Sequence, residues 1–169
     1  MRTGFRLCLV SALWALMVSG WAGAQPTPWT AVGSSGAVDP SGPSFPIHTL
    51  AGPFLSYGVA STDPISAYYN VTAVAGTNPP WTRLEMNAVV TGGPGAQVDA
   101  GLYRVKRCGK DMPELVCKVA INPTIPGPCY VCQFPAPLDF TNYEYYVLVV
   151  MQRSSSTAGW PSLRSLRIE

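Results

Sequence analysis

The sequence predicts an all-β domain, an antiparallel β-sandwich or jelly-roll-like fold of about eight or nine short strands. Three observations support this. Glycine (16 residues) and proline (17) are abundant, while charged residues make up only 12% of the chain, a composition typical of turn-rich β proteins. Short alternating or apolar stretches are separated by turn residues. After residue 28 no uninterrupted amphipathic segment is long enough for an ordinary helix. A closed β-barrel is the alternative architecture.

The N-terminus has the three parts of a secretory signal over Met1–Ala24. Arg2 and Arg6 precede the apolar run Leu7–Val18, and the small-residue site Ala22–Ala24 follows it. The apolar run is shorter than the ~20 residues that cross a bilayer. We therefore expect cleavage before Gln25, a secreted or periplasmic location, and no membrane anchor after cleavage.

Removal of that segment takes away two of the eleven basic residues and none of the nine acidic ones. The remaining side chains balance at nine of each sign. Nucleic acids and anionic lipids are bound by clustered Lys and Arg, and the charges here are scattered. We expect no nucleic-acid partner, and no sequence feature indicates a cofactor.

The rest of the chain is the size of one domain. Residues 25–28 are a predicted flexible leader, and 29–169 form the predicted single β-sandwich domain. A first weak strand over 29–38 is interrupted by glycine and serine. Proline-rich surroundings indicate edge strands over 45–50 and 54–57.

The middle of the chain gives the clearest strand patterns. Residues 65–74 alternate between two faces, and 81–90 do the same with one polar face. A Gly-rich loop joins the second stretch to the alternating residues 97–105, which predicts a hairpin.

Four further strands are predicted, over 115–121, 129–134, 143–151 and 163–168. The stretch 143–151 is rich in aromatic and β-branched residues, and we expect it to be the organising strand, buried on both faces.

Four cysteines remain after signal cleavage, which in an oxidising compartment predicts two disulfides. The simplest pairing is Cys108 with Cys117 across a loop, and Cys129 with Cys132 by exclusion. Cross-pairings stay open, because spacing does not determine connectivity. The alternative, a zinc site built from all four, requires reduced thiols, and we expect no metal.

Few residues in the sequence are arranged as a catalytic site requires. His48 is the sole histidine, and no Gly-x-Ser-x-Gly motif occurs. The nearest approach to a catalytic pair is Glu85 with Asp99, on the two arms of the predicted hairpin. A glycosidase needs two carboxyl groups separated by about 5 to 9.5 Å. An exposed pair neutralised by Arg83 is the simpler interpretation, so we assign no catalytic residue.

Aromatic residues are the stronger functional lead. Adjacent tyrosines, such as Tyr68 and Tyr69 or Tyr145 and Tyr146, point to opposite faces of a strand, so one of each pair can face outward. Exposed rings can stack on sugars or bury in a partner protein, whereas a purely structural role would place them in the core or over sheet edges. The candidate ligand-binding residues are Tyr68, Trp81, Tyr103, Tyr145 and Trp160.

Together these observations predict a secreted, non-catalytic β-sandwich protein with a binding or structural role, its ligand a carbohydrate or a partner protein. The alternative is a small carboxylate-based polysaccharide hydrolase that uses Glu85 and Asp99.

Overall fold

The computed structural model describes residues 27–39, 48–52, 54–73, 77–121 and 129–169. The predicted signal segment and the first half of the predicted leader lie outside these residues. In the described part of the chain, no helix combines the length and apolarity needed to span a membrane.

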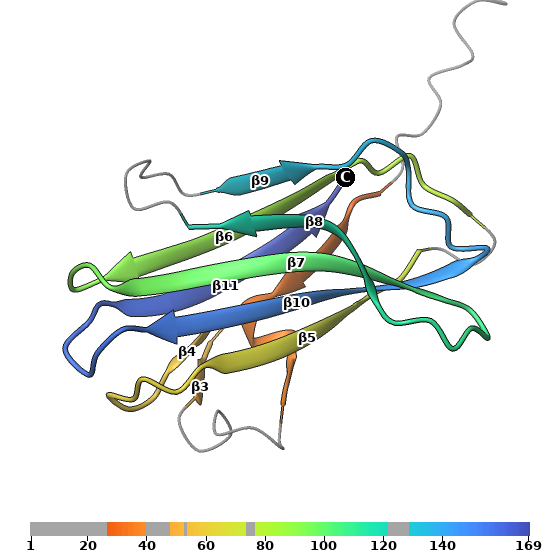
Figure 1. Cartoon of the computed structure of the whole chain (residues 1–169). Helices are drawn as coiled ribbons and strands as arrows, with labels where there is room; N and C mark the ends of the chain where they lie inside the picture. Colours follow the sequence, from red (N-terminus) through yellow and green to blue (C-terminus); the bar gives the residue numbers. More distant parts are fainter. Residues whose placement is uncertain (1–26, 40–47, 53, 74–76, 122–128) are drawn as a thin grey trace, which may run out of the picture.

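The described residues form two antiparallel β-sheets packed face to face (Figure 1). Sheet A contains β1 (Trp29–Val32), β3 (His48–Ala51), β4 (Phe54–Tyr57), β6 (Arg83–Thr91), β9 (Tyr130–Gln133) and β11 (Trp160–Ile168). Sheet B contains β2 (Ala37–Val38), β5 (Ile65–Val71), β7 (Ala96–Lys106), β8 (Glu114–Ala120) and β10 (Tyr143–Arg153). The predicted β-sandwich is confirmed, and the sheets do not close into a barrel.

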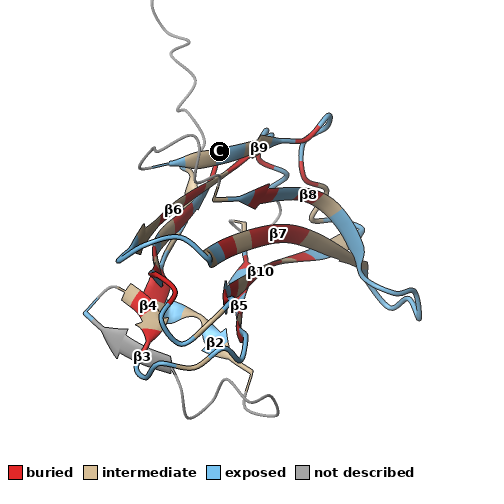
Figure 2. Cartoon of the chain, turned by 60° about the vertical axis from the view of Figure 1, so that its left-hand side comes forward, coloured by how far each residue is buried: buried red, intermediate tan, exposed pale blue. Residues whose placement is uncertain are grey.

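Each sheet is built around one long strand near the C-terminus. In sheet B, β10 lies between β5 and β7. In sheet A, β11 pairs with β6 along one edge, while β4 and β1 share its other edge. The inner faces of the two sheets supply the core, and Figure 2 shows buried residues alternating with more exposed ones along β7.

The central position of β10 matches the prediction, but burial on both faces was wrong. Val147 and Val149 point into the core and are fully buried, whereas Leu148 and Val150 are half-buried on the outer face. A two-layer sandwich has no third layer to cover that outer face. Its partial burial comes from side chains on the neighbouring strands.

The predicted hairpin over residues 81–105 is also wrong. β6 pairs with β11 and β9, whereas β7 pairs with β10 and β8. The connecting loop crosses from one sheet to the other, and Gly92, Gly93 and Gly95 adopt the positive φ values that this path requires. Alternation identified both strands correctly, but it does not specify which strands pair.

The predicted first strand divides between the two sheets. A short 3₁₀ turn at Gly33–Ser35 carries the chain from β1 in sheet A to β2 in sheet B. At Gly33 a Cβ atom would collide with the carbonyl oxygen of Leu163, so a residue without a side chain is needed at this corner.

An arginine is buried at the end of the sandwich where β10 finishes. Arg153 is 3% exposed, and its guanidinium donates hydrogen bonds to four backbone carbonyls. The same group lies 4.4 Å from the ring centroid of Trp160 and 5.5 Å from that of Tyr57. Its hydrogen bonds connect the turn between β10 and β11 with Ser61, in the loop between β4 and β5.

Candidate functional site

Three tyrosines from adjacent strands meet on the outer face of sheet B. Tyr103 of β7 and Tyr146 of β10 are directly opposite each other, with stacked rings whose centroids lie 5.3 Å apart. Tyr68 of β5 adds a third ring, 6.0 Å from that of Tyr146. We call Tyr68, Tyr146 and Tyr103 the tyrosine row.

Strand alternation places these rings outside. Tyr69 and Tyr145, one residue from their outward neighbours, are 3% and 5% exposed and belong to the core. Tyr68, in contrast, is 40% exposed. The ring of Tyr103 lies over Gly101, where a Cβ atom would come within 2.7 Å of it, so glycine gives the ring space to lie along the sheet. Leu115, also exposed, extends the apolar surface onto β8.

Tyr146 stays protonated at neutral pH. Burial raises the pKa of Tyr146 above its ordinary value, and the neighbouring Tyr103 and Tyr68 add to that effect. Its hydroxyl therefore remains both a hydrogen-bond donor and an acceptor.

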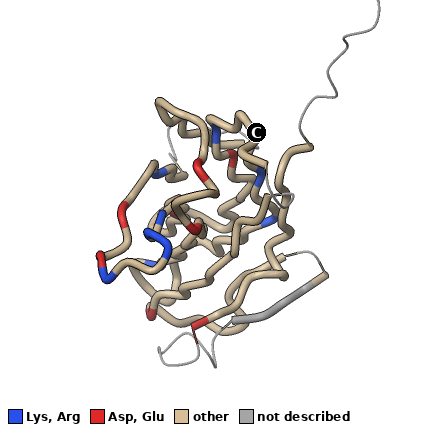
Figure 3. The backbone as a smooth tube through the Cα atoms, turned by 90° about the vertical axis from the view of Figure 1, so that its right-hand side faces the viewer, with Lys and Arg blue, Asp and Glu red and all other residues tan. Residues whose placement is uncertain are grey.

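The outer faces of both sheets carry charged side chains that form ion pairs. On sheet A, Arg83 pairs with Glu85 and Glu169, and Arg167 also pairs with Glu169. On sheet B, Ser66 and Asn70 lie beside Tyr68 on the outer face of β5. Gln97 and Gln152 lie opposite each other, nearer the other end of β7 and β10. There Asp99 forms an ion pair with Lys118 at 2.7 Å. Figure 3 shows how few charged positions the described chain carries.

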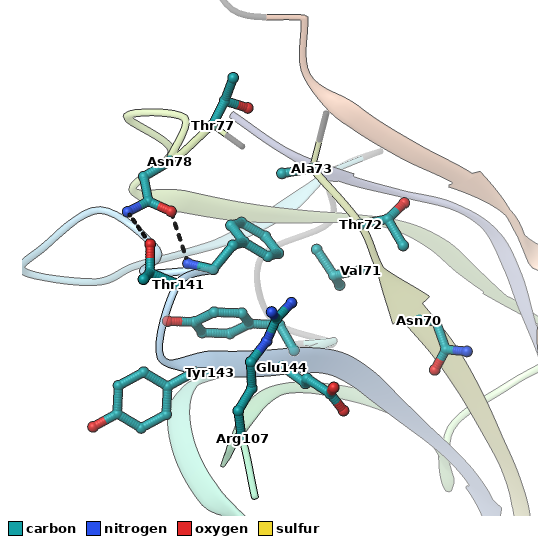
Figure 4. Close-up of a pocket in the computed structure, with 12 residues that line it drawn as sticks. Asn70, Val71, Thr72, Ala73, Thr77, Asn78, Arg107, Thr141, Tyr143 and Glu144 are labelled. Atoms are coloured by element: carbon teal, nitrogen blue, oxygen red, sulfur yellow. Dashed lines mark hydrogen bonds between the residues drawn. The ribbon is translucent and has the colours of Figure 1, made fainter. Parts of the chain in front are cut away.

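A pocket of about 540 Å³ lies where β5 and β7 end and β10 begins. Figure 4 shows Asn78 and Thr141 along one side of it, and Asn70 of β5 with Thr72, which follows that strand, along another. The remaining lining residues are Val71, Ala73, Thr77, Arg107, Phe140, Tyr143, Glu144 and Tyr145.

Hydrogen bonds hold one rim of this pocket. The carboxylate of Asp139 accepts from the backbone N–H groups of Thr141 (3.0 Å) and Asn142 (3.2 Å), and from the Asn142 side chain (2.7 Å). The bond from the Asn142 side chain is the main cause that lowers the Asp139 pKa. Asn78 accepts from the Phe140 N–H at 3.0 Å, and the Asp139 N–H donates to the Tyr145 hydroxyl. The rim is thus shaped before any ligand arrives.

The five aromatic residues selected from the sequence are not all brought together. Tyr68 and Tyr103 share the outer face of sheet B. Trp81 is 4% exposed and lies in the core, while Tyr145 forms part of the pocket floor. Trp160 is 38% exposed but lies beside Arg153, at the opposite end of β10 from the pocket.

Tyr146 was missed, because β10 is apolar on both faces and the sequence does not show which of Tyr145 and Tyr146 points inward. The cross-strand position opposite Tyr103 is the signal that would have identified it, but that signal requires the register.

The carboxylate pair considered from the sequence does not form. Glu85 lies on the outer face of sheet A, and Asp99 lies on the outer face of sheet B. Packed sheets are about 10 Å apart, and these side chains point away from each other, so their separation exceeds the glycosidase range. Glu85 and Asp99 therefore cannot share the nucleophile and acid roles of a glycosidase.

The disulfide connectivity also differs from the simplest prediction. Cys117 of β8 is bonded to Cys132 of β9, which joins the edges of the two sheets, while Cys108 and Cys129 are exposed free thiols. The register explains this. Cys117 lies opposite Leu102, so Cys108, in the loop after β7, is about 13 Å or more away along the strand. A disulfide needs Cα atoms about 4.4 to 6.8 Å apart.

Cys129 lacks the lowered thiol pKa of a reactive cysteine. A hydrogen bond with Glu85, followed by burial, raises the pKa of the Cys129 thiol, the opposite of the shift that activates a thiolate. Among the residues that the structure describes, no three His, Cys, Asp or Glu side chains are grouped to hold a metal ion. The four cysteines are not gathered as a zinc site would require.

No protein-family model and no curated protein matches the chain. Among solved structures, the chain is similar to that of a family two carbohydrate esterase from Cellvibrio japonicus, with a TM-score of 0.41 and 14% sequence identity. The match covers 84% of this chain and 33% of the esterase chain. A likeness this distant, with a chain that spans a third of the other, carries no functional argument.

Proposed function

We propose that this protein is a secreted, non-catalytic β-sandwich that binds neutral glycans on the outer face of sheet B. The supporting observation is the tyrosine row, three rings from adjacent strands on one exposed face. A tyrosine combines an apolar ring with a hydroxyl group. A sugar offers the matching combination of C–H faces and hydroxyl groups.

The surroundings of the row favour a neutral ligand. Ser66 and Asn70, on either side of Tyr68 along β5, present hydroxyl and amide groups that both donate and accept hydrogen bonds. The charges of Asp99 and Lys118 on the same face are paired with each other. No cluster of Lys or Arg adjoins the rings. Tyr68 is the most exposed ring of the row, and we expect it to contribute most of the contact area.

A protein partner on the same face is the second candidate. Leu148 and Val150 are half-buried there beside the tyrosines, and tyrosine is enriched at protein interfaces. This candidate is separated from glycan binding by the experiment below.

The positions of the carboxylates support a binding role without turnover. The hydrolase alternative rested on Glu85 and Asp99, which face away from each other on opposite sheets. Without a pair across one cleft, that mechanism has no acid and base.

Secretion is supported by the signal-like Met1–Ala24 and by the Cys117–Cys132 disulfide, since such bonds persist in oxidising compartments. Mass spectrometry of the exported protein should find a chain that begins at or near Gln25. Recovery of the full precursor from membranes would contradict this part of the proposal.

Retention on insoluble cellulose, chitin and xylan tests glycan binding. We expect the purified protein to be retained on at least one polymer without releasing soluble sugar. Tyr68→Ala with Tyr103→Ala should reduce retention at least tenfold. Val131→Ala is the matched control, because Val131 is also exposed but lies on β9 of sheet A.

Retention of the double variant equal to that of the wild type would refute the role of the tyrosine row. No retention on any polymer would shift the assignment to the protein-partner candidate. Release of soluble sugar would contradict the non-catalytic assignment. Thermal unfolding of each variant checks that losses are not caused by unfolding.

A further inference from the structure

The pocket at the end of the sandwich adjoins the tyrosine row. Asn70 lines the pocket, pairs directly with Tyr146 across the strands, and lies two residues from Tyr68 on the same face of β5. It also lines a second, smaller depression of about 320 Å³ beside Tyr68. A chain-like ligand on the row therefore reaches the pocket without crossing any intervening strand.

The pocket has one apolar wall. The rings of Phe140 and Tyr145 lie 4.9 Å apart, and both line the pocket. Trp81 packs edge-on against Phe140 at 6.0 Å, so the wall is supported from the core. The volume of the pocket is within the ~300–1,000 Å³ typical of small-ligand sites.

The polar lining carries both signs of charge. Arg107 and Glu144 both line the pocket, so an anionic ligand would gain from one and lose to the other. The site therefore favours a ligand without net charge.

The remaining polar groups are amides and hydroxyls. Asn70, Asn78, Thr72 and Thr141 each offer both a donor and an acceptor. The matching ligand has many hydroxyl groups, no charge and one apolar face, which describes a pyranose ring.

We propose that this pocket binds one neutral pyranose unit of the glycan that lies on the tyrosine row. The inference rests on the proposed function and adds a defined subsite to it. The row supplies contact area along the ligand, and the pocket supplies hydrogen bonds that select the unit at its end.

Calorimetric titration with cellohexaose, xylohexaose and chitohexaose tests the subsite, with trigalacturonic acid as the acidic probe. Arg107→Ala and Thr72→Val alter exposed pocket side chains. Each should weaken binding of the best neutral hexaose about tenfold, the loss expected for a hydrogen bond in a binding site. Lys110→Ala, exposed in the same loop as Arg107, should bind as the wild type does.

The outcomes separate this inference from the proposed function. If Tyr68→Ala weakens hexaose binding while Arg107→Ala and Thr72→Val do not, the row binds glycan and the pocket does not. Retention on insoluble polymer without hexaose binding would likewise overturn the pocket assignment alone. Tighter binding of trigalacturonic acid than of every neutral hexaose would refute the neutral ligand. Failure of both retention and titration would refute both proposals.

Discussion

Arg153 is a charged side chain held in the interior by backbone carbonyls. Its Nε donates to Gly159 (3.1 Å), its Nη1 to Ser61 (3.3 Å), and its Nη2 to Ser156 (2.9 Å) and Ala158 (2.7 Å). The substitution Arg153→Met keeps much of the apolar stem and removes all four donors. We expect this change to be among the most destabilising single substitutions in the domain.

The magnitude follows from which carbonyls can regain water. Ala158 and Gly159 are buried, whereas Ser61 and Ser156 are at least partly exposed. Each buried acceptor left without a donor costs about 1 to 3 kcal/mol. Two such acceptors give a loss of about 2 to 6 kcal/mol, and we expect about 4 kcal/mol. That is a large share of the ~5–15 kcal/mol that stabilises an ordinary domain.

Urea unfolding followed by tryptophan fluorescence measures the loss. With a slope of about 1 to 3 kcal/mol per molar urea, a loss of about 4 kcal/mol lowers the midpoint by about 1.3 to 4 M. Arg164→Met is the matched control. Arg164 is exposed and lies 5.7 Å from the ring centroid of Phe54, so its loss should be ~1 kcal/mol or less.

Arg153→Lys keeps the charge but not the planar fork that reaches several carbonyls at once. It should fall between the wild type and Arg153→Met. If Arg153→Met unfolds within 1 kcal/mol of the Arg164→Met control, the four hydrogen bonds do not stabilise the fold, and the argument from buried acceptors is wrong.

Three further predictions concern stability. Reduction of the Cys117–Cys132 bond, which closes 15 residues, should cost ~3 kcal/mol, and alkylation before reduction should label two thiols in the mature chain rather than none or four. Val149→Asn should be far more destabilising than Val150→Asn in urea unfolding, because only Val149 is fully buried; equal effects would contradict the exposed outer face. Burial raises the Tyr57 pKa to about 12, so the folded state holds this proton more tightly than the unfolded chain does. The contribution of Tyr57 to stability should be complete below pH 10 and decrease as the pH rises toward 12, so Tyr57→Phe should reduce the loss of stability over that range.

Alternation in the sequence was sufficient to find most strands and many of their inner faces. Ile65–Val71 shows this best, because its outer residues Ser66, Tyr68 and Asn70 all carry polar groups, whereas most of its inner residues are apolar. The contrast is missing in β10, where Leu148 and Val150 resemble Val147 and Val149. The inward tyrosine, Tyr145, was therefore selected in place of Tyr146.

Strand pairing was the part that local patterns did not supply. Residues in β6 and β7 read as two arms of a hairpin, yet they belong to different sheets: β6 pairs with β9 and β11, and β7 pairs with β8 and β10. The simplest disulfide pairing differs from the structure for the same reason, since Cys117 and Cys132 meet only once the edges of the two sheets lie together. The pocket was also missed, because its lining comes from several separate segments.

The placement of β11 has a consequence for how the molecule assembles. This strand fills the middle of sheet A, yet it follows every other described strand in the sequence, and its pairing of Ser165 with Val32 joins residues far apart in the chain. Until it arrives, β1, β4 and β6 lack their shared neighbour, and their open edges can pair wrongly. Such distant pairing also slows folding. For a chain exported as proposed, sheet A would be completed only after translocation, in a single late step.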